Sequence, residues 1–278
     1  MTIFESAVLG LLQGLAEFLP ISSSGHLALL EHFFGIEGEK VLSFAVLLHV
    51  GTLISIFAVY RKDIWELIVE LGAVFKDIFT GRGLMVNKND TRRLGFMIIV
   101  ATIPTVIAGF TLRDTFALLY ANIPAIGAAL IVTGTMMFFA ERGAYGARGL
   151  MEMKFSHAIL VGVLQSVALC PGISRSGATI VGGLVSGLNR EFAVRFAFLI
   201  SIPSVIGAVI LEAPEAFKGG IDTAMLLPIV LGVALAAIAG FIAIKAMIRV
   251  VSGKKLYYFS IYTWILGAGA IVYALFFI

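Results

Sequence analysis

Two stretches of this chain are copies of one another: GLLQGLAEFLPISSSGHL at Gly10–Leu27 and GVLQSVALCPGISRSGAT at Gly162–Thr179. They align without a gap at an offset of 152 residues, and eight of the eighteen aligned positions are identical. The identities include a Gln, two Ser and two Gly, which chance matching of apolar residues rarely supplies in register. The chain is therefore predicted to be one domain built from two related halves, 1–150 and 151–278.

The sequence around the two copies is typical of a membrane protein. Hydrophobic residues fill 60% of the 278 positions and charged residues only 13%, about half of the ~25% that is usual in soluble domains. Six continuous apolar runs approach or exceed the ~20 residues that a helix needs to cross the hydrocarbon core. The runs are Phe44–Tyr60, Leu94–Leu112, Ile123–Ala140, Phe196–Leu211, Ala224–Ile244 and Tyr257–Ile278. Because their apolar residues do not alternate with polar ones, we expect an all-α polytopic membrane protein with six transmembrane helices.

The segments between the apolar runs divide into two groups by charge. Four segments together hold sixteen Lys and Arg residues, and three others hold three. The basic group comprises 61–93, 141–154, 190–195 and 245–255, and the other group comprises 36–43, 112–122 and 212–222. Because Lys and Arg collect in cytoplasmic loops, the basic group is predicted to face the cytoplasm. The formal net charge of +3 fits this distribution and does not indicate a nucleic-acid partner.

This charge pattern constrains the two repeated stretches. With six spans, segments 2–35 and 156–187 must each begin and end on one side of the membrane, as re-entrant hairpins would. The second arm of the first hairpin, His26–Gly35, has ten residues, or about 15 Å as a helix, half of the bilayer core. Two complete crossings per segment would give the same sidedness and stay open as an alternative.

The two halves are predicted to have opposite orientations in the membrane. The charge pattern directs Phe44–Tyr60 inward and its aligned counterpart, Phe196–Leu211, outward. Such inverted repeats are related by a two-fold axis in the membrane plane, and their broken helices meet near the midplane. The two hairpins should therefore form one buried site.

Each hairpin carries groups suited to an anion, above all a phosphate. Pro and Gly interrupt the helix, and hydroxyls and free backbone N–H groups then lie at the start of the next helix. We expect substrate-binding groups at Ser22, Ser24, Gly25, Ser174, Ser176, Gly177 and Thr179. Thr179 lies four residues after Arg175, on the same helix face; alternatively its hydroxyl only bonds to its own helix.

Arg175 is the only basic residue inside an otherwise apolar segment. Its planar fork of donors matches a phosphate, although it could also pair with Glu17 to hold the halves together, and the two roles are compatible. Glu17 is the only acid in the apolar arm of the first hairpin, and Gln13 lies one turn before it. These two residues could bind a divalent cation, or Glu17 could act as a base. A purely structural Glu17 is the alternative.

The first hairpin also holds a candidate nucleophile and base. Ser23 is followed three residues later by His26, and Gly25 allows the turn to bring them together. Phosphoryl transfer needs an attacking oxygen and a proton acceptor, which these side chains supply. The alternative is that the serines and His26 only cap a short helix. His49, inside a predicted span, is either a neighbour of the site or a packed polar residue.

At these residues the sequence resembles a known family. EFLPISSSGH at Glu17–His26 and PGISRSGAT at Pro171–Thr179 resemble the two signature segments of the undecaprenyl-diphosphate phosphatases of the bacitracin-resistance type. The resemblance covers nearly the whole chain. It implies an enzyme of the bacterial plasma membrane that converts undecaprenyl diphosphate into the monophosphate carrier of peptidoglycan synthesis. It also implies a need for Mg²⁺ or Ca²⁺ and a site open to the outer face.

The resemblance assigns roles to particular positions. The acidic pair of the family falls on Gln13 and Glu17, so one carboxylate is replaced by an amide and Glu17 remains the main metal or base candidate. The family's serine and histidine fall on Ser23 and His26, and its arginine on Arg175. Its phosphate-contacting hydroxyls fall on Ser174, Ser176 and Thr179.

The mechanism expected from these residues has Ser23 attack the terminal phosphorus with help from His26, while Arg175 and a cation on Glu17 neutralise the diphosphate. In a variant, His26 or Glu17 activates water directly. The rival function is a secondary transporter or flippase of a phosphorylated isoprenoid lipid, because inverted repeats with broken helices are transporter architecture. The predicted partners are undecaprenyl diphosphate and the lipid bilayer, and the oligomeric state is open, with a homodimer as one alternative.

Overall fold

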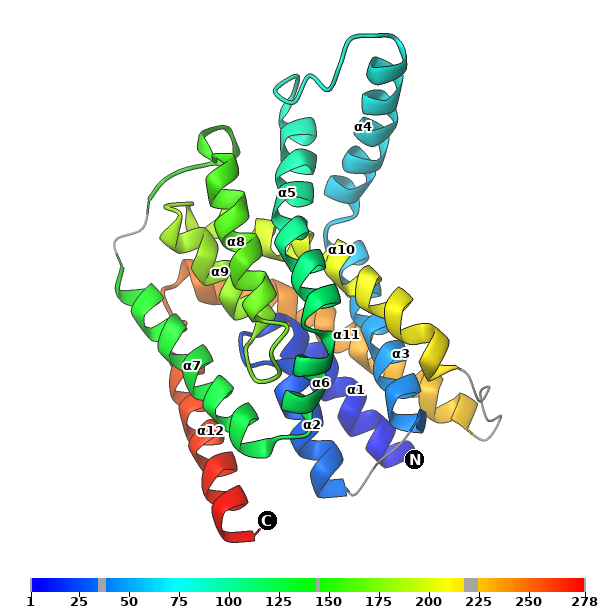
Figure 1. Cartoon of the computed structure of the whole chain (residues 1–278), viewed down its shortest axis with the longest axis vertical. Coiled ribbons are helices and arrows are strands. Elements are labelled where there is room, and N and C mark those ends of the chain that lie inside the picture. Colours follow the sequence, from blue (N-terminus) through cyan, green and yellow to red (C-terminus); the bar gives the residue numbers. More distant parts are fainter. Residues whose placement is uncertain (1, 35–38, 144–145, 218–224, 278) are drawn as a thin grey trace.

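The computed structural model describes residues 2–34, 39–143, 146–217 and 225–277 (Figure 1). Within those ranges it consists of helices joined by loops, without a β-strand. The predicted outer segments 36–43 and 212–222 lie partly outside the described residues, as do the first residue of the span 224–244 and the last of 257–278.

The helices are α1 (Ile3–Phe18), α2 (Ser23–Phe34), α3 (Glu39–Val59), α4 (Arg61–Phe79), α5 (Asp90–Thr111), α6 (Arg113–Tyr120), α7 (Ile123–Arg142), the 3-10 turn η1 (Leu150–Glu152), α8 (Phe155–Val167), α9 (Arg175–Val185), α10 (Arg190–Ala216), α11 (Leu226–Ser252) and α12 (Tyr257–Phe277).

Five helices are long and apolar enough to cross a membrane, namely α5, α7, α10, α11 and α12. They coincide with five of the six predicted spans, and the chain is a multi-pass helical membrane protein. The remaining predicted span corresponds to α3, whose apolar part, Phe44–Val59, is followed by α4 after a bend of 88°. The two helices pass the same length and composition test only when they are taken together.

Two segments that the sequence analysis treats as loops are helical. α4 occupies most of segment 61–93, and α6 occupies most of segment 112–122. Both helices mix charged with apolar residues, so a search for continuous apolar runs passes over them. α4 packs against α5, where the fully buried side chain of Arg92 bonds to Glu70 at 2.6 Å and to Asp77 at 2.8 Å.

The repeated stretches form two helical hairpins, α1–α2 and α8–α9, whose loops meet inside the bundle (Figure 1). Their second arms have 12 and 11 residues, or about 18 and 17 Å at 1.5 Å per residue. That length is a little over half of the ~30 Å hydrocarbon core. The helices α2 and α9 are therefore too short to cross a bilayer.

The first arm of each hairpin packs on a helix of the opposite half. α1 lies against α11, and α8 lies against α5. The backbones are closest at Gly10, where a Cβ would collide with Gly232, and at Gly162, where it would collide with the carbonyl oxygen of Ala101. Small residues allow such close helix contacts inside a membrane. Because Gly10 and Gly162 are aligned identities, the same residue makes the same crossing in each half.

A single methyl group tests this crossing. We expect Gly162→Ala to lower the free energy of unfolding by about 1–3 kcal/mol, because the backbones of α8 and α5 must separate. Gly207→Ala is the matched control, since a Cβ there meets nothing within 4 Å and should stabilise α10 by about 0.5–1 kcal/mol. Thermal unfolding in detergent measures both. Equal unfolding temperatures for the two variants would contradict the crossing.

Candidate functional site

The loops of the two hairpins touch each other at equivalent positions. A Cβ on Gly25 would lie 3.0 Å from the Cα of Gly172, and a Cβ on Gly177 would lie 3.3 Å from the Cβ of Pro20. The two contacts join equivalent positions of the repeat, because Gly25 aligns with Gly177 and Pro20 aligns with Gly172. Each loop therefore contacts the other through the same pair of aligned positions.

Each loop ends in a serine that caps the following helix. The hydroxyl of Ser22 accepts from the N–H of Gly25 at 3.3 Å, and that of Ser174 accepts from the N–H of Gly177 at 3.1 Å. Ser22 has φ of +72°, and Gly172 in the other loop has φ of +94°. The side chains of Ser22 and Ser174 therefore satisfy backbone donors of their own helices, which for Ser22 is the capping that the sequence offered as an alternative.

The remaining predicted phosphate-binding hydroxyls also have partners inside the chain. Ser24 lies 3.4 Å from the hydroxyl of Ser22. Ser176 donates to the carbonyl oxygen of Leu19 in the first hairpin at 3.1 Å, which joins the two loops. Thr179 donates to the carbonyl oxygen of Arg175 at 2.8 Å, so the alternative in which it bonds to its own helix is the arrangement observed.

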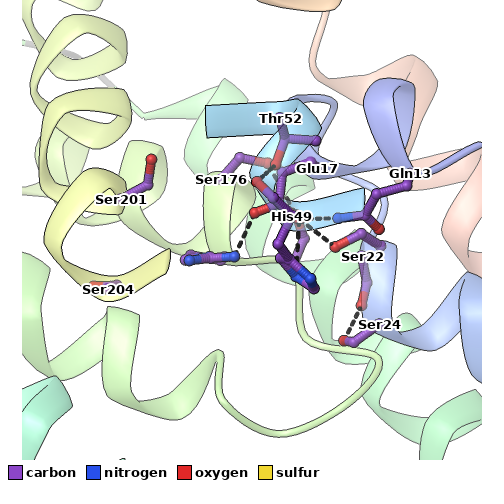
Figure 2. Close-up of polar contacts among 12 residues, drawn as sticks. Gln13, Glu17, Ser22, Ser24, His49, Thr52, Ser176, Ser201 and Ser204 are labelled. Carbon is purple, nitrogen blue, oxygen red and sulfur yellow. Dashed lines mark hydrogen bonds and ion pairs between the residues drawn. The ribbon is translucent and has the colours of Figure 1, made fainter. Parts of the chain in front are cut away.

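Glu17 is the centre of a polar cluster at the meeting of the hairpins (Figure 2). Its Oε1 accepts a hydrogen bond from Arg175, and its Oε2 accepts from Ser23 at 2.7 Å and from Gln13 at 3.1 Å. The ring of His49, on α3, lies 4.0 Å from Oε2. His49 is thus a neighbour of the site, as one of its two predicted alternatives states. Four side chains from four helices converge on one carboxylate.

The cluster is closed around Glu17 and partly open around its partners. The side chain of Glu17 is only 3% exposed, whereas those of Arg175 and His49 are each 22% exposed. Ser23 is also partly exposed. A ligand can therefore reach the guanidinium and the hydroxyl directly, while the carboxylate stays behind them.

The predicted contact between Ser23 and His26 is wrong for this structure. The two ring nitrogens of His26 have other partners: Nδ1 lies 2.8 Å from the carbonyl oxygen of Ser22, and Nε2 lies 2.7 Å from the hydroxyl of Tyr262. The ring also stacks on Tyr262, with 5.6 Å between centroids. His26 points toward Tyr262 on α12, and Ser23 points toward Glu17 on α1. Glu17 takes the place next to Ser23 that the sequence analysis gave to His26.

Gln13 has the property expected of a cation ligand. Its amide nitrogen donates to Glu17, and its buried Oε1 has no hydrogen-bond partner among the described residues. A buried acceptor without a donor is costly, and a cation would satisfy it. The described residues contain no group of three or more His, Cys, Asp or Glu side chains arranged for a metal. The residues therefore fit an ion that takes most of its ligands from phosphate oxygens and water.

Two residues that sequence reasoning missed support the loops. Thr133 on α7 donates to the carbonyl oxygen of Gly172 at 2.9 Å and accepts from the N–H of Ser174 at 3.0 Å, which fixes the second loop. Tyr262 on α12 holds His26. Both lie inside apolar spans, where a single polar residue distant in sequence gives no local signal of its partner.

Comparisons with known proteins find a matching family and similar proteins. The family model described as "Bacitracin resistance protein BacA" matches residues 6–269. A protein of Alkaliphilus metalliredigens named undecaprenyl-diphosphatase is 44% identical over 275 residues, which cover 99% of this chain and 100% of that protein. Proteins of the same name from Desulforapulum autotrophicum and Carboxydothermus hydrogenoformans are each 39% identical, over 98% of this chain and 98% and 97% of their own lengths.

The Glu17–Arg175 pair should contribute measurably to stability. We expect Glu17→Gln and Arg175→Gln each to lower the free energy of unfolding by about 2 kcal/mol, below the ~3–5 of a fully buried pair because Arg175 is partly exposed. The double variant should lose about 1–2 kcal/mol less than the sum. Thermal unfolding of the four proteins gives this coupling.

The pair of Asp63 and Arg195 is the matched control, because its side chains are 21% and 43% exposed. Asp63→Asn and Arg195→Gln should couple by less than about 1 kcal/mol. If the coupling at Glu17 and Arg175 were no larger than this, the two residues would not form the buried pair described.

Proposed function

The chain belongs to the bacitracin resistance protein BacA family, and we propose that it hydrolyses undecaprenyl diphosphate to undecaprenyl phosphate and inorganic phosphate. The reaction recycles the lipid carrier of peptidoglycan synthesis. The observation that carries the proposal is the hydrogen bond from Ser23 to Glu17 beside Arg175. The Ser23 hydroxyl, the Glu17 carboxylate as proton acceptor and the Arg175 guanidinium thus lie together. They do so in a membrane protein whose relatives are named undecaprenyl-diphosphatase.

Arg175 has two successive partners in this mechanism. In the structure it is paired with Glu17, and its side chain is partly exposed. An incoming diphosphate offers several acceptor oxygens in the geometry that a guanidinium prefers. Arg175 then turns to the phosphate, while the hydroxyl of Ser23 keeps its hydrogen bond to Glu17. The two roles that the sequence analysis considered for Arg175 are then the states before and after substrate binding.

The chemical step follows from the position of Ser23. Its Oγ attacks the terminal phosphorus while its proton passes to Oε2 of Glu17, 2.7 Å away. The bond between this phosphorus and the bridging oxygen breaks, and undecaprenyl phosphate leaves with the electron pair. Water then attacks the phosphoserine and the bond between Oγ and phosphorus breaks. Ser23 takes its proton back from Glu17, and inorganic phosphate is released. Arg175 and the N–H groups at the starts of α2 and α9 stabilise the developing charge.

His26 has a positioning role in this proposal. Its ring is held between the carbonyl oxygen of Ser22 and the hydroxyl of Tyr262. It therefore fixes the turn that places Ser23 against Glu17. In the variant with direct attack by water, Glu17 is the base and Ser23 only binds the phosphate.

We further propose that a divalent cation, Mg²⁺ or Ca²⁺, binds between the protein and the diphosphate. Its protein ligands would be Glu17 and Oε1 of Gln13, which has no hydrogen-bond partner within the described part of the chain. The cation would supply neutralisation of the phosphate charge.

The membrane arrangement in this proposal comprises six transmembrane helices and two re-entrant hairpins, in inverted halves 1–150 and 151–278. The equivalent crossings at Gly10 and Gly162 and the doubled contact between the loops support it. The chain lies in the bacterial inner membrane, and the site opens to the outer face, away from the basic segments. A transporter or flippase could share this architecture, but it would have no use for a serine hydroxyl bonded to a carboxylate.

The nucleophile is tested by phosphate release from purified protein in detergent, where transport cannot be scored. Ser23→Ala should lower kcat at least about a thousandfold, because the attacking oxygen is lost. Glu17→Gln should lower it about a hundredfold or more. Ser204→Ala is the control, since Ser204 only bonds to its own helix on α10. Near-normal turnover by Ser23→Ala would rule out the phosphoserine route.

The cation proposal is tested separately. A chelator should abolish phosphate release, and added Mg²⁺ or Ca²⁺ should restore it. Gln13→Leu should raise the cation concentration for half-maximal activity at least about tenfold. Gln165→Leu, at the aligned position, is the control, because Gln165 bonds to Thr105 and not to Glu17. An unchanged cation requirement in Gln13→Leu would remove Gln13 from the site.

A further inference from the structure

An apolar groove of about 580 Å³ lies on the side of the molecule formed by α7, α8 and α9. α7 contributes residues from Ile131 to Gly143, α8 contributes Leu164, and α9 contributes residues from Val181 onward. Figure 1 shows these three helices side by side at the edge of the bundle. Val185 faces outward, with 66% of its surface exposed. The groove is therefore open to the bilayer, and an apolar hollow at this depth is filled by a hydrocarbon chain.

The length of the groove matches one leaflet. Its α7 side runs over thirteen residues, from Ile131 to Gly143, the residue after α7, and these span about 18 Å along a helix. Half of the ~30 Å hydrocarbon core is about 15 Å. An ordinary acyl chain has this reach, whereas a 55-carbon isoprenoid chain would extend far beyond the groove.

The end of the groove at Gly143 and Gly187 carries positive charge. Arg142 precedes Gly143 and stacks on Phe138, with its guanidinium carbon 4.0 Å from the ring centre. Arg148 donates to the carbonyl oxygen of Ser186 at 2.8 Å and lies against Gly187. Both arginines are exposed. They belong to the basic segment 141–154, which the charge pattern places at the cytoplasmic surface.

A second polar observation marks the same end. The hydroxyl of Ser186, between the lining residues Val185 and Gly187, is buried and has no hydrogen-bond partner among the described residues. The two acids of this segment have other partners. Glu141 accepts from Arg190 at 2.8 Å, and Glu152 accepts from the N–H of Gly149 at 2.8 Å. The groove end is thus basic, and a phosphate oxygen would complement its two arginines.

We propose that this groove binds an anionic phospholipid of the cytoplasmic leaflet, with one acyl chain between α7 and α9 and the phosphate at Arg142 and Arg148. Basic groups beside a slot between transmembrane helices are typical of such sites. The groove lies on the side of α9 that packs against α7 and away from Glu17. Because α9 begins with Arg175 and ends at the groove, a bound lipid also holds the helix that carries the phosphate-binding arginine.

Native mass spectrometry of the delipidated full chain tests the proposal, with phosphatidylglycerol and phosphatidylcholine of identical acyl chains as probes. The wild type should bind the first phosphatidylglycerol about 25-fold more tightly than phosphatidylcholine, or about fivefold for each arginine. Arg142→Gln should lose about fivefold, and Arg142→Gln with Arg148→Gln should lose the preference entirely. Arg249→Gln, also exposed at a basic helix end, is the matched control.

Val185→Trp should block the groove and lower the binding of both lipids to background, whereas Ile238→Trp, at an exposed position on α11, should not. Phosphate release within twofold of wild type shows that each variant is folded. A retained preference in Arg142→Gln, or normal binding to Val185→Trp, would overturn the proposal. Stronger binding of undecaprenyl phosphate than of phosphatidylglycerol, lost in the same variants, would assign the groove to the isoprenoid product instead.

Discussion

The structure depends on one carboxylate that is buried where a bilayer surrounds the protein. An ionised group at that depth is costly unless a partner of opposite charge is next to it. Glu17 finds its partner in Arg175, which comes from the other half of the chain. The pair therefore requires both hairpins to be present and their loops to touch. The fold and the site are specified by the same contact.

The repeat explains how two similar hairpins supply different groups. Ser23 and Arg175 occupy aligned positions, each the first residue of the second arm. A two-fold arrangement places these positions on opposite sides of a common centre, and Glu17 lies between them with one oxygen toward each. The counterpart of Glu17 is Leu169, so the centre holds a single carboxylate. In the proposed mechanism, the first copy supplies the oxygen that attacks, and the second supplies the guanidinium that binds the phosphate.

The sequence was sufficient for the parts of the fold that depend on local composition. Continuous apolar runs located the spans α5, α7, α10, α11 and α12, and identical residues in register located the hairpins. α4 and α6 were missed because they mix charged and apolar residues. The members of the site were also predicted, since Glu17 and Arg175 are charges in apolar surroundings.

The contacts within the site were harder to predict. Spacing along the chain suggested that Ser23 meets His26, but Ser23 donates to Glu17, and both ring nitrogens of His26 have other partners. His26 meets Tyr262, which is 236 residues away, and the second loop is held by Thr133. Such partners are determined by how helices that are distant in sequence pack, and the spacing of residues along one sequence does not predict that packing.

A structure determined with a non-hydrolysable analogue, in which a methylene group replaces the bridging oxygen of the diphosphate, tests whether Ser23 is the nucleophile. We expect the terminal phosphorus to lie about 3–3.5 Å from Oγ of Ser23, within reach for attack. Arg175 should have turned from Glu17 to the phosphate oxygens. A diphosphate bound next to His26 and Tyr262, with the pair of Glu17 and Arg175 intact, would contradict the account.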